Sequence, residues 1–206
     1  MSETADTAGP TLAASLRLTA VALQDAVTSL VEGEESFPMS PASVERALRA
    51  VADLDDVEPT PVVGMDSGHA DSSATRQALS EVHIACEAQA LAELAREVAR
   101  VASSLRAPVP DRLLAIVRQM SEVCVDAVGR TADALEHRGI PALRLPVPYD
   151  EVGRLQQSLL AACVDEVELQ VAFAVTLVGR FFVRFADHTA AVVHHVRLLA
   201  TATNPG

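Results

Sequence analysis

Long runs in which apolar residues recur three and four positions apart constrain this 206-residue chain more than any other feature. The first run carries Leu16, Ala20, Leu23, Val27 and Leu30. Residues at these spacings share one face of an α-helix, so the run predicts an amphipathic helix over residues 11–31 that packs against other helices. Residues 1–10 are predicted to form a tail, and Gly33 is predicted to end the helix.

Five further segments show helical spacing and are separated by Pro and Gly. They predict helices over residues 41–55, 72–105, 111–138, 149–163 and 166–200. Ser40 before Pro41 is a helix start signal, and Asp165 with Glu168 has the spacing of a capping box. Two Pro and two Gly within residues 57–70 exclude regular helix there, and 140–148 is a Pro-punctuated connector.

The composition favours the same fold class. Half of the residues are hydrophobic, but aromatic residues make up only 3% and Trp is absent, whereas sheets are rich in aromatic and β-branched residues. The chain is therefore predicted to be all-α. The predicted helices follow the order long, short, long twice, which suggests an internal duplication. A shift of 94 positions places Glu93 on Asp187.

Charge and cysteine content narrow the classes of function. A net charge of −12 argues against a nucleic-acid-binding protein, which needs a basic surface to replace phosphate counterions. Cys86, Cys124 and Cys163 are widely separated within apolar helical patterns, which predicts buried, unreactive thiols and a cytoplasmic protein. The polar, acidic N-terminus is not typical of a signal peptide, and the apolar run at 171–179 is too short to span a membrane.

One polar stripe lies within the last predicted helix. Residues 177–188 read L-V-G-R-F-F-V-R-F-A-D-H, and Arg180, Arg184 and His188 are four apart, so they share a helix face with Asp187 beside them. These three residues are candidates for partner contact. The alternative is that they are solvated or paired within the bundle.

Two residue pairs have the four-residue spacing of a metal-binding motif, but neither pair has both of the carboxylates that such a motif needs. Gln89 with Glu93, and Val183 with Asp187, are four apart, but each pair supplies only one carboxylate. Ion pairing is the alternative, with Glu93 bound to Arg96 or Arg100 and Asp187 bound to Arg184. Several histidines could also supply ligands or remain plain helix residues, and these are His83 (four before Glu87), His188, His194 and His195. No phosphate-binding Gly loop, nucleophile elbow or Cys/His pair is visible, so an enzyme is not predicted.

Two segments carry a resemblance to a known family. H-I-A-C-E-A-Q-A-L-A-E-L-A-R-E-V-A at 83–99 and G-R-F-F-V-R-F-A-D-H-T-A at 179–190 resemble motifs of the PhoU family of phosphate-signalling regulators. In the second segment the matching residues are Gly179, Arg180, Arg184, Phe185, Ala186, Asp187 and His188.

The resemblance implies two tandem three-helix bundles, over residues 1–107 (with a loop at 56–71) and 108–206. It also implies a homodimeric, non-enzymatic adaptor between a phosphate ABC transporter ATPase and a sensor histidine kinase, which restrains signalling when phosphate is plentiful. In the family each bundle carries a Glu/Asp-x-x-x-Asp motif that binds metal clusters.

This chain departs from that motif, because Gln89 and Val183 stand where carboxylates are expected and only Glu93 and Asp187 remain. We therefore expect no cofactor, with a divalent metal left open. A metal-binding or metal-sensing bundle, and a paralogue that only forms heterodimers, are the alternative interpretations.

Overall fold

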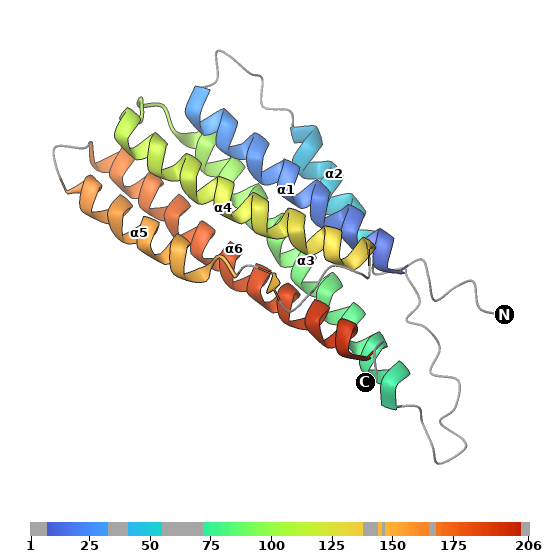
Figure 1. Ribbon diagram of the computed structural model, residues 1–206. Helices are drawn as coiled ribbons and strands as arrows, with labels where there is room; N and C mark the ends of the chain where they lie inside the picture. The colour runs from blue at the N-terminus through green and yellow to red at the C-terminus, as the bar shows by residue number, and fades with distance from the viewer. Residues whose placement is uncertain are drawn as a thin grey trace.

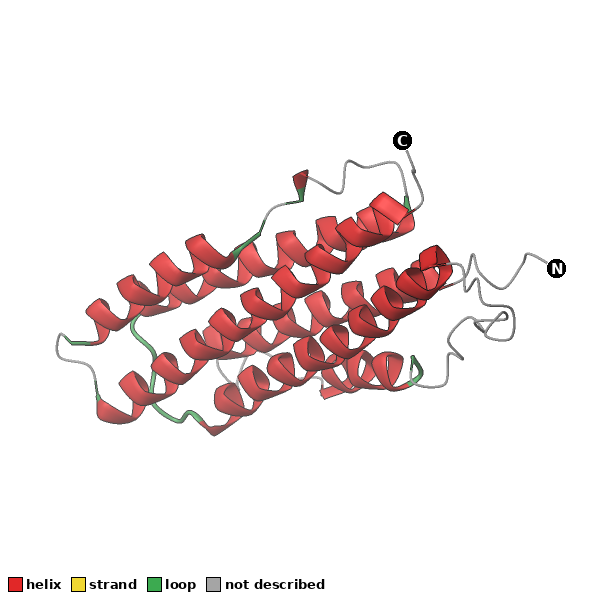
Figure 2. Cartoon of the chain, turned by 90° about the horizontal axis from the view of Figure 1, so that it is seen from below, coloured by secondary structure: helices red, strands yellow, loops and turns green. Residues whose placement is uncertain are grey.

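The computed structural model describes residues 8–32, 41–54, 72–137, 144–145, 147–164 and 168–202. Within these ranges six helices account for 91% of the residues, and no strand occurs there (Figures 1 and 2). The helices are α1 (Ala8–Glu32), α2 (Pro41–Ala52), α3 (Ser72–Ser104), α4 (Asp111–Glu136), α5 (Tyr149–Cys163) and α6 (Leu169–Ala202). The predicted all-α fold class is confirmed.

The helix boundaries follow the local signals to within three residues, and α2 ends at Ala52 rather than at residue 55, while α6 begins at Leu169 rather than at residue 166. α5 has the predicted bounds, and α4 begins at Asp111, directly after a connection that contains Pro108 and Pro110. α1 begins at Ala8, so the prediction of a tail over residues 1–10 is wrong for its last three residues. Pro10 is tolerated there because a first-turn residue needs no N–H for helix bonding. Gly33, Ser40, Asp165 and the 57–70 segment lie outside the described residues.

The helices form two trios that pack side by side. α1, α2 and α3 contact one another and make the N-terminal trio, and α4, α5 and α6 make the C-terminal trio. The trios join where α1 packs on α4 and α3 packs on α6, while α2 and α5 lie on opposite outer sides (Figure 1). Helix lengths of 25, 12 and 33 residues in one trio match 26, 15 and 34 in the other, as the long, short, long order predicts. The division into two domains stays a prediction.

The apolar stripes meet in one continuous core to which all six helices contribute. The five spaced residues of α1 predicted to pack inward are all buried, and the spaced apolar residues of α4 are buried too (Leu114, Val117, Met120, Cys124, Val128 and Leu135). Phe182 and Phe185 are the largest fully buried side chains among the described residues. They lie on α6, which packs against α3, α4 and α5, so most of its circumference faces other helices.

A glycine allows α5 to approach α6 closely. A Cβ atom built on Gly179 would lie 2.8 Å from the Cδ2 atom of Leu159, which is itself fully buried. Glycine is used where backbone and side chain come this near, even though it weakens a helix interior by about 1 kcal/mol relative to alanine.

One arginine connects the trios at their surface. The Nη2 atom of Arg17 on α1 lies 2.7 Å from Asp133 Oδ1 and 2.5 Å from Glu136 Oε2 on α4. Hydrogen bonds to these two carboxylates raise the pKa of Arg17. Because all three side chains are substantially exposed to solvent, we expect this link to add well under about 1 kcal/mol per pair.

α6 is the described helix that is long and apolar enough, by length and composition alone, to cross a membrane. The core helix of a bundle meets the same criterion, and 44% of its apolar window is buried inside this bundle. The prediction that the chain has no membrane span stays a prediction.

Candidate functional site

The first pair of predicted metal residues lies on the outer face of α3. Gln89 is exposed, and the Glu93 carboxylate makes an ion pair with Arg96, one turn further along the same helix. This is one of the two pairings that the sequence predicted for Glu93. Arg100 pairs instead with Glu97, at 3.1 Å.

The second pair has even fewer donor atoms. Val183 is partly buried and packs against the core, and Asp187 is exposed, with no ion pair to Arg184 or to any other described residue. A neutral amide, a valine, an exposed carboxylate and a carboxylate already bound to arginine do not fit a metal cluster. Among the described residues no group of three or more His, Cys, Asp and Glu side chains could hold a metal ion.

The three partner-contact candidates divide into two kinds. Arg180 and Arg184 are exposed and make no ion pair within the described part of the chain. His188 is only 28% exposed, and its Nδ1 atom lies 2.6 Å from Glu87 Oε2 on α3. His188 therefore connects the two trios, whereas the two arginines face solvent.

The arginines share their face with exposed apolar residues. Phe173, seven positions before Arg180, is 71% exposed, and Leu169 is 83% exposed. Residues seven apart lie two turns apart on one side of a helix. We call Leu169, Phe173, Arg180 and Arg184 the outer face of α6. At the adjoining end of α5, Leu160 and Val164 are also exposed.

A histidine cluster, which sequence reasoning did not assemble, lies between α3 and α6. The His83 ring on α3 stacks on the His195 ring on α6, with centroids 4.6 Å apart and planes 11° apart. The His194 ring meets His195 edge-on at 5.4 Å. The sequence places these residues only as pairs within one helix. The antiparallel packing of α3 on α6, which also brings Glu87 to His188, makes them one group.

The cysteine prediction is partly wrong. Cys124 is fully buried beneath α6, with its Sγ atom 4.0 Å from the Phe182 carbonyl oxygen, and burial raises its pKa to about 12. Cys86, however, is exposed, and Cys163 is half-buried. All three thiols are free. Cys86 lies on the side of α3 that no other helix covers, a fact that helical spacing alone does not reveal.

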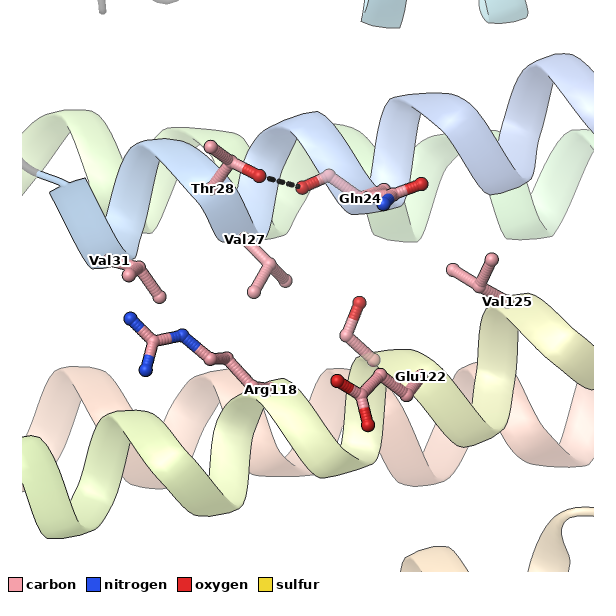
Figure 3. Close-up of a pocket in the computed structure, with 8 residues that line it drawn as sticks. Gln24, Val27, Thr28, Val31, Arg118, Glu122 and Val125 are labelled. Atoms are coloured by element: carbon pink, nitrogen blue, oxygen red, sulfur yellow. Dashed lines mark hydrogen bonds between the residues drawn. The ribbon is translucent and has the colours of Figure 1, made fainter. Parts of the chain in front are cut away.

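Two open cavities lie elsewhere on the bundle. The first, of about 240 Å³, separates α1 from α4, and Figure 3 shows Val27 and Val31 of α1 facing Arg118 and Glu122 of α4. Thr28 does not offer its hydroxyl hydrogen to this space, because it bonds to the Gln24 carbonyl oxygen at 2.9 Å. The second, of about 430 Å³, lies between the end of α1 and the connection from α3 to α4. Neither was predicted from the sequence.

The first cavity has the chemistry of a weak, shallow site. Its lining includes one cation (Arg118), one carboxylate (Glu122) and several valines. Arg118 and Glu122 make no ion pair with each other although they are one turn apart. Ligand pockets usually have about 300–1,000 Å³ and enclose most of their ligand, so this groove is small and open for that role. The outer face of α6 is the better candidate for recognition.

Comparison with known proteins identified no relative of this chain. No family model matches the chain, and no curated protein and no solved structure matches it.

Proposed function

We propose that this chain is a non-enzymatic, cytoplasmic regulator of phosphate uptake and signalling, which binds a partner protein through the outer face of α6. The single observation that carries the proposal is the pair Arg180 and Arg184, exposed one turn apart without an acidic partner among the described residues, beside an exposed Phe173. Arginine and aromatic residues are the types that most often dominate the binding energy of protein interfaces.

The electrostatics of this face favour specific pairing over general attraction. The chain carries a net charge of −12, and Arg180 and Arg184 place two positive charges, unpaired within the described residues, one turn apart on the same helix face. Asp187, one turn beyond Arg184, is also exposed. A partner that places carboxylates opposite the arginines would form charge-assisted hydrogen bonds, which arginine makes in a bidentate geometry.

The link to phosphate rests on the resemblance to the PhoU family. Apart from His188, which is half-buried and bonded to Glu87, burial divides the matching residues into two groups. Gly179, Phe185 and Ala186 are buried, so packing of α6 accounts for them. The exposed matches are Arg180, Arg184 and Asp187, and no contact within the described fold accounts for them. Exposed polar residues without a packing role suit a binding function. The partners we propose are accordingly a phosphate ABC transporter ATPase or a sensor histidine kinase, with a second copy of the chain completing a homodimer.

The test is affinity capture of the tagged full chain from cells grown with ample and with limiting phosphate, followed by mass spectrometry. Recovery of the transporter ATPase or of a sensor kinase, in amounts that change with phosphate, is the expected result. In the double variant Arg180→Ala/Arg184→Ala this recovery should fall at least about tenfold, because arginine is among the residue types that dominate interface binding energy and a loss of about 1.4 kcal/mol is tenfold in affinity.

The matched control is Arg46→Ala/Arg49→Ala on α2, which removes the same charge from another exposed helix face. Circular dichroism should show unchanged helicity for both double variants, since neither pair contributes to the core. Equal recovery of partners with the α6 variant and with the α2 variant would show that the outer face of α6 is not the binding surface. Absence of both proposed partners in both growth conditions would contradict the phosphate role itself.

A further inference from the structure

The histidine cluster is the part of the α3–α6 interface that apolar packing does not explain. The two helices pack on each other, and both bury small and branched apolar side chains such as Ile84, Ala88 and Val192. At the cluster, two imidazole rings stack instead, and a third meets them edge-on. Uncharged rings can pack in this way as aromatic groups, but two imidazolium ions cannot without strong repulsion.

His195 is the member of the cluster with a buried, unsatisfied ring nitrogen, because its Nδ1 atom has no hydrogen-bond partner within the described part of the chain. Burial lowers the pKa of His195, positive charge on His83 and on His194 would lower it further, and the Glu87 carboxylate opposes them with a smaller effect. Glu87 is already bonded to His188.

We propose that the His83–His195 stack is a pH-sensitive joint between the two trios, closed when both rings are neutral and opened when His195 takes up a proton. The two rings come from different helices, so their repulsion acts directly on the packing of α3 on α6. The groups that face His195 are His83 and Glu87 from α3 and His194 from its own helix. The joint is independent of the function proposed above.

The direction of the pH effect follows from the lowered pKa. In the unfolded or locally opened chain, His195 would titrate near the ordinary value of 6.5. The open form therefore binds a proton more readily than the closed form, so acid favours opening. The stacked, closed form is therefore most stable above pH 6.5. Its stability relative to the open form decreases as the pH falls from 6.5 towards the lowered pKa of His195 in the closed form.

Hydrogen exchange of the full chain, followed by mass spectrometry at about pH 7.5 and about pH 5.5 with labelling times scaled for intrinsic exchange, tests the joint. Peptides covering 79–90 and 190–199 should exchange at least about tenfold faster at the lower pH, relative to peptides covering 113–128. His195→Gln cannot acquire the charge and should lose this acid response. His137→Gln, at the exposed C-terminal end of α4, should keep it.

A second variant and a second measurement keep the proposal testable even if His195→Gln fails to fold. His83→Gln changes an exposed residue and removes the stack from the α3 side, so the acid response should shrink several-fold. Titration of the histidine ring protons by nuclear magnetic resonance should place the pKa of His195 below 6.5. Equal relative exchange at both pH values, a full acid response in His195→Gln or His83→Gln, or a His195 pKa at or above 6.5 would each overturn the proposal.

Discussion

The interior and the outer surface of α6 hold the same residue type in opposite environments. Phe182 is fully buried where α6 meets the rest of its trio, whereas Phe173, nine positions earlier on the same helix, is 71% exposed. Cys124 and Cys86 show the same contrast on α4 and α3. Residue type therefore does not decide burial in this bundle. What decides it is whether another helix covers that side of the helix, and the uncovered sides are where we place recognition.

The sharpest test of this contrast is a pair of phenylalanine truncations. Phe182→Ala should lower the free energy of unfolding by about 3–5 kcal/mol, because it leaves a cavity in a closely packed core. Phe173→Ala should change it by less than about 0.5 kcal/mol, because the side chain faces solvent. Urea unfolding followed by circular dichroism measures both. A comparable loss in the two variants would mean that another part of the chain covers the outer face of α6.

The cysteines test the same contrast by reactivity. Only the thiolate reacts with an alkylating or disulfide reagent, and the pKa of Cys124 is about 12 compared with an ordinary value of 9.0. At about pH 8 we therefore expect Cys124 to react at least about tenfold more slowly than the exposed Cys86 in the native protein, because burial disfavours its thiolate and also excludes the reagent. Mass spectrometry of digested, labelled samples assigns each site. Rapid labelling of Cys124 under native conditions would contradict its burial, and labelling in denaturant provides the reference rate.

Two helix glycines give the smallest expected effect. A Cβ atom at Gly129 on α4 would have no heavy atom within 4 Å, so Gly129→Ala should stabilise the protein by up to about 1 kcal/mol. Gly179→Ala gains the same helix preference but must displace Leu159, and overpacking of this kind costs about 1–3 kcal/mol. The Gly179 variant should therefore unfold at a lower urea concentration than the Gly129 variant. Equal midpoints would show that α5 can shift away from α6 without cost.

Much of the fold could be predicted because the signals involved are local. The spacing of apolar residues identified the helices, and the starts of α4 and α5 followed from the prolines that precede them. The ion pair of Glu93 with Arg96 was also predictable, since residues three apart are neighbours in any α-helix.

The candidate site was less predictable, because its properties depend on which sides of the helices are covered. Arg180, Arg184 and His188 have equivalent spacing in the sequence, but His188 alone lies within reach of Glu87 from another helix. The exposure of Cys86 was mispredicted for the same reason. Its apolar neighbours indicate a helix but do not show that α3 leaves one side open.

The sequence by itself determined that the described residues form six helices, placed the helix ends to within three residues, and indicated which residues form the apolar stripes, because a helix depends on contacts within a few positions. Only the tertiary structure decided that His83 stacks on His195, that Glu87 reaches His188 and that Phe173 remains exposed. These features require the register between α3 and α6 and the coverage of each helix. Both are set by how side chains interlock across the whole core, which no local spacing encodes.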